Sequence, residues 1–537
     1  MKPIKYFVSF LIYVTIAFYA IEPTYANAPN LSPIRIGLTS NLGNVNSITI
    51  NSLGINIGFE TSWGFQQIAY INNTSPITAA PDWSFYFSVG TFFSFIDANA
   101  EAVSLRTRGF RAVPAVRGIG LWTVYVGGYA GELDAAADMA ALWGTPAPAN
   151  NRRILLSAGG ANLLVIDSAD YFPQFTTATG TPIQIGTRFF RGRIEIMRRP
   201  GQNLTAVNII NLEEYLWSVV PNEMPASWPE EALRAQAVAS RTFSVTRRGG
   251  GTHVNDGFDL CNTTCCHVYT GLDAETAATT TAVNSTSGML IWHGNSTILA
   301  SYFASSGGFT DNSENVWINA LPYLRSVAEI YEPDPLIWTR SFTLADLNAA
   351  MAARPAGSPQ IGNATNMTIG RMENNRVQEL IIHGTAGTLS LNREQIRTFF
   401  APVGGSLPSR NFVLAGSAPT HGATPDIAIQ VLGAGGIRTQ PPHISTLHIR
   451  TSSGFSTPLT TSAGATVSVL GSHMIHSYTL DIQTQTSPPP HGTFVLNGRG
   501  HGHGVGMSQQ GARGMALRGY NFIQILQHYY TGAEVRR

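Results

Sequence analysis

Charged side chains are scarce in this chain of 537 residues. They make up 12% of the sequence, and the formal net charge is +1. Such a composition creates no strong field of one sign, so it gives no support to a nucleic-acid partner or to electrostatic attachment to a membrane surface. Cysteine is also rare. The three cysteines all lie between positions 261 and 266, which confines any disulfide or thiolate metal site to that segment.

Long apolar runs are missing from the sequence except near its start. Lys2 and Lys5 precede an apolar stretch from Tyr6 to Ala20, and small residues follow at 24–26, the pattern of a secretory signal over residues 1–26. An uncleaved anchor is the alternative, but the stretch is shorter than the ~20 residues of a membrane span. We therefore expect an exported protein of the periplasm or cell wall, without a transmembrane span after cleavage.

One glutamate stands out for its position. Glu223 lies between Pro221 and Pro225, just before an alanine-rich segment, Ser227 to Val245, that is predicted to be helical. Ser227 has Glu230 three residues later, the spacing of a capping box.

A carboxyl placed in this way is a candidate proton donor if its surroundings are apolar enough to raise its pKa. The alternative is that Glu223 only stabilises the positive end of the helix. Glu213 and Glu214 are weaker candidates because their sequence is typical of a packed helix start.

A second distinctive segment is rich in glycine. Residues 498–509 read GRGHGHGVGMSQ, and alternating glycines allow the backbone to approach a substrate closely. His501 and His503 have no third metal ligand nearby in the sequence. Hydrogen bonding to substrate or packing is therefore favoured for them over metal binding.

Together, the E-M-P sequence at Glu223 and the G-H-G-V-G-M-S-Q sequence resemble the stage II sporulation protein D family, also called the LytB-type amidase-enhancer family. Members of that family are exported cell-wall proteins, and its sporulation branch cleaves peptidoglycan glycan strands that have lost their peptides. The resemblance implies that Glu223 is the catalytic acid.

The chemistry implied by this resemblance is that of a lytic transglycosylase. Most glycosidases need two carboxyls, whereas here the C6 hydroxyl of the muramyl sugar attacks its own anomeric carbon and leaves a 1,6-anhydro end. One glutamate then suffices, and no cofactor is required for the chemistry. Two alternatives are a non-catalytic enhancer of a cell-wall amidase and a pure wall-binding protein. The candidate substrate contacts are Gln236, Arg241, Ser305, Ser306, His501, His503, Gly504 and Gln509.

The cysteine cluster has two interpretations. Cys261, Cys265 and Cys266 can form one disulfide with a spare thiol, or they can bind zinc together with a histidine. In the family resemblance a comparable segment carries a structural zinc in some members, which implies a tetrad of His253 and the three cysteines. Cys265 stands where the family has histidine, and His267, the substitute ligand, stands where it has glutamine.

Residues 83–145 repeat a strand followed by a helix. This duplication resembles a sporulation-related repeat (SPOR) domain, which implies a small ferredoxin-like insertion whose sheet binds peptide-free glycan. The candidate glycan contacts are Phe92, Trp122 and Tyr129. The alternative is a small insertion without a binding role, because aromatic residues in strands are commonly core residues.

The predicted fold class is α+β, with a β-rich, two-lobed catalytic region, the alanine-rich helix and the SPOR-like insertion. The length predicts two to four domains. The predicted segments are 1–26 (signal peptide), 33–80 (N-terminal strands), 83–145 (SPOR-like domain), 150–332 (catalytic domain), 333–415 (second lobe), 416–490 (added β-rich or loop segment) and 491–537 (C-terminal motif and helices).

Overall fold

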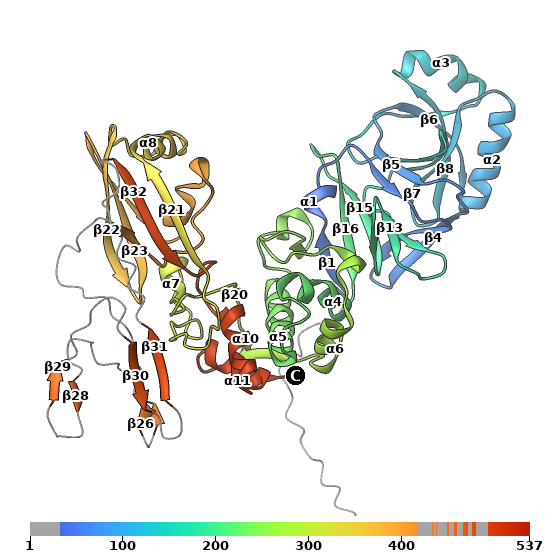
Figure 1. Cartoon of the computed structure of the whole chain (residues 1–537). Helices are drawn as coiled ribbons and strands as arrows, with labels where there is room; N and C mark the ends of the chain where they lie inside the picture. Colours follow the sequence, from blue (N-terminus) through green and yellow to red (C-terminus); the bar gives the residue numbers. More distant parts are fainter. Residues whose placement is uncertain are drawn as a thin grey trace, which may run out of the picture. The chain divides into compact units, whose positions relative to one another are not determined.

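Two large sheets contain the strands of the first half of the chain (Figure 1). The computed structural model describes residues 33–415 and 492–537, with short strands between 432 and 479; the predicted signal peptide and most of the added segment 416–490 lie outside the described residues. The seven-stranded sheet has the order β17 (Leu260–Cys261), β1 (Ile34–Gly37), β16 (Leu204–Ile210), β15 (Arg193–Arg198), β12 (Gln174–Thr177), β3 (Ile55–Thr61) and β4 (Gly64–Ile71).

The second sheet has ten strands and includes the predicted insertion. Its order is β14 (Arg188–Phe190), β13 (Ile183–Ile185), β2 (Ile48–Ile50), β5 (Ile77–Pro81), β10 (Ile154–Ala158), β11 (Ala161–Ile166), β7 (Ala112–Gly118), β8 (Leu121–Tyr129), β6 (Phe85–Phe92) and β9 (Thr145–Ala147). With α2 (Phe95–Thr107) and α3 (Glu132–Ala141), the last four strands form a β-α-β-β-α-β unit. Their pairings are antiparallel in the order β7-β8-β6-β9, so the predicted ferredoxin-like arrangement is confirmed.

The three predicted glycan contacts of this unit do not form an open platform. The Trp122 side chain is 2% exposed and packs against Phe95 of α2, and the ring of Phe92 packs against the same core. Tyr129 stacks on Phe87 and hydrogen-bonds Asp138 of α3. Side chains alternate between the two faces of a strand, and these three belong to the face that α2 and α3 cover. The predicted exposed binding surface is therefore wrong for these residues.

Four helices gather around the alanine-rich helix α5 (Glu230–Arg247), as Figure 1 shows for α4, α10 and α11. The small side chains of α5, such as Ala235 and Ala239, are fully buried, which allows neighbouring helices to approach closely. The other helices of this layer are α4 (Leu212–Glu223), α6 (Ala277–Ser285), α10 (Gln509–Leu517) and α11 (Phe522–Tyr529).

The predicted start of the alanine-rich helix is three residues too early. Pro229 occupies the N-cap position of α5, and no side chain caps the helix there. Ser227 instead lies in a turn in which the Trp228 amide donates to the Pro225 carbonyl. The capping-box spacing was therefore misleading, because a proline-flanked turn fixes the entry to the helix.

A second hydrophobic core, separate from the first, lies in the region predicted as a second lobe. It includes Phe342, Leu380, Phe400 and Leu496. Its elements are β21 (Ile337–Thr343), α8 (Leu344–Ala352), β22 (Ala364–Glu373), β23 (Arg376–Gly384), β24 (Gly387–Asn392), α9 (Gln395–Thr398), β25 (Phe412–Ala415) and β32 (Thr493–Arg499). Strand β32 is central in the order β21-β32-β25, so the C-terminal segment completes this lobe.

The C-terminal segment then returns to the first core. Strand β33 (Met507–Ser508) pairs in parallel with β20 (Tyr302–Phe303), and β34 (Glu534–Arg536) pairs with β18 (Leu290–His293). This return brings residues 498–509 to the alanine-rich helix, which is where the sequence motifs meet.

Candidate functional site

Glu223 is the last residue of α4 and lies half-buried beside the glycine-rich segment. Burial raises the pKa of its carboxyl above the ordinary value, and this outweighs the opposite effect of hydrogen bonds from Gln509, from Tyr302 and from the backbone of Val268. A carboxyl in such surroundings keeps its proton to a higher pH than an exposed glutamate does.

Gln509 joins the two motifs, although they lie 286 positions apart. Its Nε2 donates to Glu223 Oε2 at 3.3 Å and to Gln236 Oε1 at 3.4 Å. Gln509 opens α10, whose N-cap residue Ser508 accepts a hydrogen bond from the Gly511 amide. The capped helix start therefore fixes the amide that holds the candidate acid.

Gln236 was predicted to contact substrate, but its side chain has no exposed surface. Its Nε2 donates to Ser240 Oγ at 2.9 Å, and Ser240 Oγ donates to Tyr302 Oη at 3.4 Å. Gln236 therefore acts within the protein, on the inner side of Glu223, and this corrects the prediction.

The two histidines of the glycine-rich segment have different surroundings. His501 is exposed, and its backbone pairs with Ser305. His503 is half-buried between the rings of Phe303 and Trp317, at centroid distances of 5.6 and 5.3 Å. Burial lowers its pKa to about 3, so the ring is neutral near pH 7, and Nδ1 accepts from the Val505 amide.

A glycine is required at position 504 because the backbone there passes close to the side chain of Arg376. It has a positive φ of 90°, and a Cβ there would lie 2.6 Å from the guanidinium carbon of Arg376. Its carbonyl accepts from the Asp311 amide at 2.7 Å. Gly504 is buried, so its observed role is to let the loop cross a buried arginine.

Ser305 and Ser306 are also fully buried, and they hold a carboxylate of the protein. Ser305 Oγ, the Ser306 and Gly307 amides and Ser508 Oγ all donate to Glu332. The predicted direct contact of the two serines with substrate is corrected, because both side chains are buried: Ser305 Oγ donates to Glu332, and Ser306 Oγ accepts from the Gly308 amide.

Arg241 likewise serves the helix packing. Its side chain has no exposed surface and binds both carboxylate oxygens of Glu213, at 2.8 and 2.6 Å. The same guanidinium donates to the carbonyls of Val283 and Met289. This corrects its predicted contact with substrate, and it ties α4, which carries Glu223, to α5.

Four candidate metal ligands come together as the sequence predicted. One donor atom each of His253, Cys261, Cys265 and Cys266 lies within 4.8 Å of the others. Ligands of a tetrahedral zinc lie about 3.8 Å apart when the Zn–S bonds are about 2.3 Å long, so the set fits zinc. His253 Nδ1 pairs with Asp256 at 2.8 Å, which orients Nε2 toward the cluster.

The thiols of this cluster are free of disulfides. The hydrogen bond from Cys266 lowers the pKa of Cys261 to about 4, so one thiolate is favoured before any metal binds. His267 is not part of the set: its Nδ1 lies 3.1 Å from Tyr215 Oη, and its ring is buried. The predicted substitute role of His267 is therefore wrong.

Sequence reasoning missed three residues of the site. Ser240 lies on the predicted alanine-rich helix without a signal of its own, and Tyr302 lies three residues before the candidate contact Ser305, so the sequence marks the segment of Tyr302 but not its side chain. Glu332 lies outside any regular element and near Pro333. The only feature that could have drawn attention to Glu332 is its negative charge in a chain with few charged residues, because its hydrogen-bond partners are distant in the sequence.

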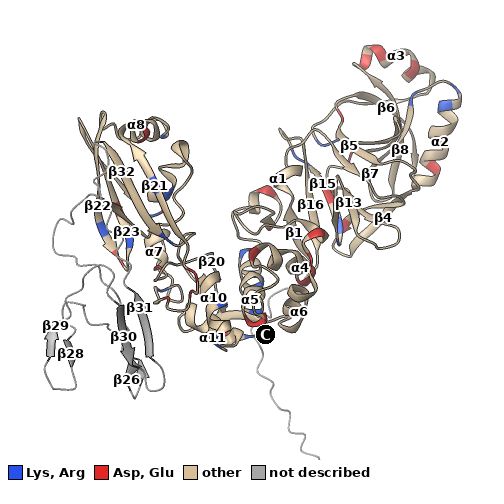
Figure 2. Cartoon of the chain, in the orientation of Figure 1, with Lys and Arg blue, Asp and Glu red and all other residues tan. Residues whose placement is uncertain are grey.

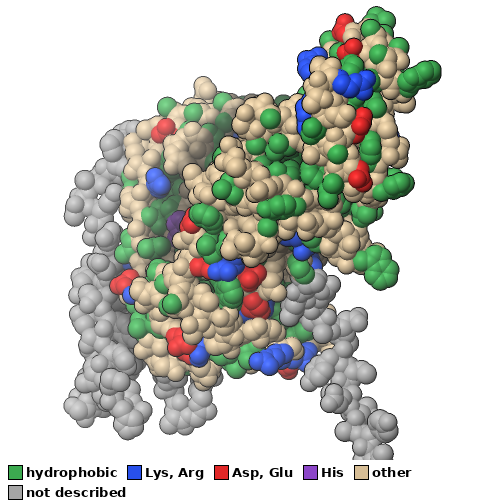
Figure 3. Space-filling view, turned by 90° about the vertical axis from the view of Figure 1, so that its right-hand side faces the viewer, with side chains coloured by type: hydrophobic (Ala, Val, Ile, Leu, Met, Phe, Trp, Pro, Cys, Tyr) green, Lys and Arg blue, Asp and Glu red, His purple; other side chains and the backbone are tan. Residues whose placement is uncertain are grey.

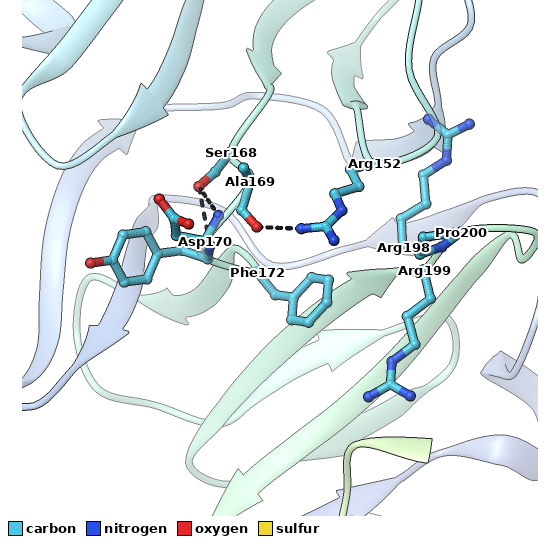
Figure 4. A pocket seen from close by; sticks show the side chains of 9 residues that line it. Arg152, Ser168, Ala169, Asp170, Phe172, Arg198, Arg199 and Pro200 are labelled. Atoms are coloured by element: carbon cyan, nitrogen blue, oxygen red, sulfur yellow. Dashed lines mark hydrogen bonds between the residues drawn. The ribbon is translucent and has the colours of Figure 1, made fainter. Parts of the chain in front are cut away.

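A pocket of about 360 Å³ lies elsewhere and contains none of the predicted site residues. Figure 4 shows its arginines: Arg152 points toward the Ala169 carbonyl, and Arg198 and Arg199 extend in opposite directions from the end of β15. Arg198 is buried, with its guanidinium 3.9 Å from the ring centroid of Trp83. This basic pocket is therefore a feature separate from the surroundings of Glu223.

Acidic and basic side chains are interspersed along the described elements (Figure 2) and on the face shown in Figure 3. This agrees with the low net charge. No helix within residues 33–415 and 492–537 is both long and apolar enough to cross a lipid bilayer.

Comparison with known proteins gives a family-model match that includes the segment carrying Glu223. Residues 200–293 match the family model described as SpoIID, stage II sporulation protein. The chain is 30% identical over 321 residues to the amidase enhancer of Bacillus subtilis (strain 168), covering 59% of this chain and 39% of that protein. It is 34% identical over 194 residues to the stage II sporulation protein D of the same organism and 32% identical over 200 residues to that of Bacillus amyloliquefaciens.

These two matches each cover 33% of this chain and 55% of the relative. The chain therefore spans between two fifths and just over half of the relatives that it matches. The predicted resemblance to the stage II sporulation protein D and amidase-enhancer family is confirmed by these matches. Three residues of the hydrogen-bonded group at Glu223 lie within the matched segment 200–293: Glu223, Gln236 and Ser240.

Proposed function

We propose that this protein is exported to the cell wall and cleaves peptide-poor glycan strands of peptidoglycan as a lytic transglycosylase. The match of residues 200–293 to the stage II sporulation protein family model supports this proposal. The observation that carries the proposal is the state of Glu223. Its carboxyl has a raised pKa, and its side-chain partners are the neutral groups of Gln509 and Tyr302. A lone carboxyl whose pKa is raised suits a reaction that needs one acid and then one base.

The proposed reaction balances with this one group. Glu223 donates its proton to the glycosidic oxygen, the bond to the anomeric carbon breaks, and the leaving sugar keeps a free hydroxyl. The C6 hydroxyl of the muramyl sugar attacks the anomeric carbon, and its proton passes to the Glu223 carboxylate. The products are a 1,6-anhydro end and a new sugar end. Water is not consumed, and the enzyme regains its proton.

Two further carboxylates of this region, Glu213 and Glu332, already have partners within the protein. Glu213 is bound by Arg241, and Glu332 is surrounded by serine hydroxyls and amides. Each is engaged in structural contacts. This arrangement supports a substrate nucleophile over a second protein carboxylate.

A second function is favoured by one comparison. One relative bears the name amidase enhancer, and its match covers more of this chain than the sporulation proteins do. The second proposal is therefore that the chain binds the wall or a cell-wall amidase and stimulates that enzyme without cleaving glycan itself.

The two proposals differ in the products formed by the purified protein alone. Glycan strands freed of peptides are incubated with the full chain, and the soluble products are separated by mass. Transglycosylase action is expected to release fragments with 1,6-anhydro ends, 18 mass units below the hydrolysed form of the same fragment, because no water is added. Hydrolysed ends would contradict the proposed mechanism. Intact strands together with faster cleavage by an added amidase would support the enhancer.

We also propose that the four-ligand cluster holds a structural zinc ion. The ion would tie the segment around His253 to β17, which lies at the edge of the seven-stranded sheet beside β1. Bound zinc would replace the disulfide alternative, since it uses all three thiolates.

Removal of this zinc is expected to lower the melting temperature by about 5–10 °C, because loss of a tight ligand costs about 2–4 kcal/mol of stability. The measurement is thermal unfolding before and after chelation, with metal content determined in parallel. Adding back Zn²⁺ should restore the original value. Less than one zinc per chain, together with one disulfide and one free thiol among the three cysteines, would contradict the proposal.

The ferredoxin-like unit remains a proposed glycan-binding module. Its topology supports this role, but binding would use a surface other than the face beneath α2 and α3.

A further inference from the structure

Four hydrogen bonds link five side chains in a chain that runs from Glu223 to Tyr302, and the hydroxyl of Tyr302 at its far end interacts electrostatically with the Glu223 carboxyl, which closes the group into a ring. We call it the acid ring, and its members are Glu223, Gln509, Gln236, Ser240 and Tyr302. They come from α4, α10, α5 and β20, so the ring joins four elements of the fold. It deepens the proposed function, because its meaning rests on Glu223 being the proton donor.

In each hydrogen bond of the ring, the neighbouring contacts decide which group donates and which accepts. The Gln509 amide group donates to both Glu223 Oε2 and Gln236 Oε1, so the oxygen of Gln236 faces Gln509. The amide nitrogen of Gln236 must then face Ser240, and it donates to Ser240 Oγ at 2.9 Å. An amide side chain has its donor and acceptor at opposite corners, so the orientation of Gln236 follows from its two neighbours.

The donors and acceptors on the other side of the ring are assigned in the same way. Ser240 Oγ has one hydrogen, and it is used toward Tyr302 Oη at 3.4 Å. Tyr302 also has one hydrogen. Its oxygen already accepts from Ser240, and the Glu223 carboxyl is the ring member left to receive its hydrogen, a contact that favours the ionised carboxylate. Glu223 therefore receives two donors and meets no acceptor within the ring.

We propose that Tyr302 is a positioning residue: its hydroxyl, held by Ser240, donates to Glu223 and leaves the acid proton of Glu223 on the side away from the ring, where a substrate oxygen can take it. The proton of Glu223 cannot point into the ring, because it would then meet the N–H of Gln509 or the O–H of Tyr302, which are also hydrogen-bond donors. The same donors then stabilise the carboxylate after transfer. Tyr302 thus assists both proton steps without touching the substrate.

The ring of Tyr302 has a separate packing role that a conservative change preserves. It stacks on His267 with a centroid distance of 6.0 Å and an angle of 15°. Tyr302→Phe therefore removes the hydroxyl and keeps the stack. Tyr530→Phe is the matched control, since Tyr530 is buried and its hydroxyl donates to the Ser301 carbonyl at 2.8 Å, next to Tyr302 but outside the acid ring.

The test follows the pKa of Glu223 directly. The protein is labelled with ¹³C at the side-chain carboxyl of glutamate, and the Glu223 signal is identified by its loss in Glu223→Gln. Tyr302→Phe is expected to raise the Glu223 pKa by about one unit, because a hydrogen bond that favours the ionised form is lost. Tyr530→Phe should leave it unchanged. An unchanged value in Tyr302→Phe, or an equal rise in both variants, would overturn the inference.

Kinetics add a second readout. For a general acid, the rate falls as pH rises through its pKa, so the alkaline limb of the kcat profile should move to higher pH in Tyr302→Phe by the same amount as the NMR value. We expect kcat to fall about ten-fold and KM to change less than about two-fold, because the carboxyl loses orientation while substrate contacts remain.

The outcomes separate this inference from the proposed function. If the wild type cleaves no glycan, the transglycosylase proposal fails, while the NMR titration still decides the acid ring. If Tyr302→Phe does not fold, Ser240→Ala replaces it: this variant keeps the tyrosine but removes the donor that polarises its hydroxyl. A rise in the Glu223 pKa is expected there too, and its absence would overturn the inference.

Discussion

Glu223→Gln is expected to reduce the rate of glycan cleavage by at least about 10³-fold, because the proposed reaction uses this one group as acid and then as base. Glutamine has the size and shape of the protonated carboxyl, so the half-buried site and the contact with Gln509 can persist. An amide cannot deliver a proton to the glycosidic oxygen. The measurement is the initial rate of release of 1,6-anhydro fragments from peptide-free strands, with KM determined to show that binding remains.

The matched control is Glu214→Gln, which makes the same substitution in the same helix, α4. It is expected to retain cleavage within about two-fold, since Glu214 lies in the first turn of α4 and Glu223 is the last residue of that helix. Glu223→Gln should also be no less stable than the wild type at neutral pH. The raised pKa means that the folded state binds the proton more tightly than the unfolded state, so the ionised carboxylate costs stability as pH rises. Unchanged cleavage by Glu223→Gln would remove this residue from the chemistry.

The motifs of the site could be predicted from the sequence, whereas their contacts could not. Glu223 and the glycine-rich segment each have an unusual local composition, and the four metal-ligand candidates have a recognisable spacing. Gln509 of the glycine-rich segment contacts Glu223, and the four candidate ligands lie together. Local patterns carry such signals because close backbone approach and metal binding require particular residue types.

The roles of individual polar residues were predicted less well from the sequence. Gln236, Arg241, Ser305 and Ser306 are polar and near the motifs, yet they bind Glu223 neighbours or other protein groups and have no exposed surface. A sequence gives the residue type but not the partner, and a buried polar group must find a partner wherever the fold provides one. Tyr302 shows the opposite outcome: it lies in the same segment as the candidate contacts Ser305 and Ser306, but its own side chain was not predicted to act.

The sequence also could not predict which face of a strand is exposed. Trp122 and Tyr129 have the types expected of a glycan platform, but the face that they occupy is covered by α2 and α3. Alternation predicts that two faces exist, and it does not say which face the helices cover. The ferredoxin-like order of the strands was predicted because it depends only on the sequence of elements.

Asp311→Asn is expected to destabilise the protein by about 3–5 kcal/mol, the cost of leaving buried charge without its partner. Asp311 is 2% exposed and binds Arg410 directly, with Arg376 Nε 4.0 Å away, and both arginine side chains have no exposed surface. Burial lowers the pKa of Arg376 to about 10 and lowers that of Arg410, which shows how poorly this region solvates positive charge. One carboxylate thus compensates two buried cations.

The loss should also reach the glycine-rich segment, because the Asp311 amide donates to the Gly504 carbonyl and Asp311 pairs with Val505. Urea unfolding followed by circular dichroism gives the free-energy change. Asp334→Asn is the control, since that side chain is 80% exposed and lies 3.7 Å from Arg513, where an ion pair contributes about 0–1 kcal/mol. Equal effects of the two substitutions would contradict the interpretation. A large effect confined to Asp311→Asn would show that this ion group fixes the loop that continues to Gln509 and the acid.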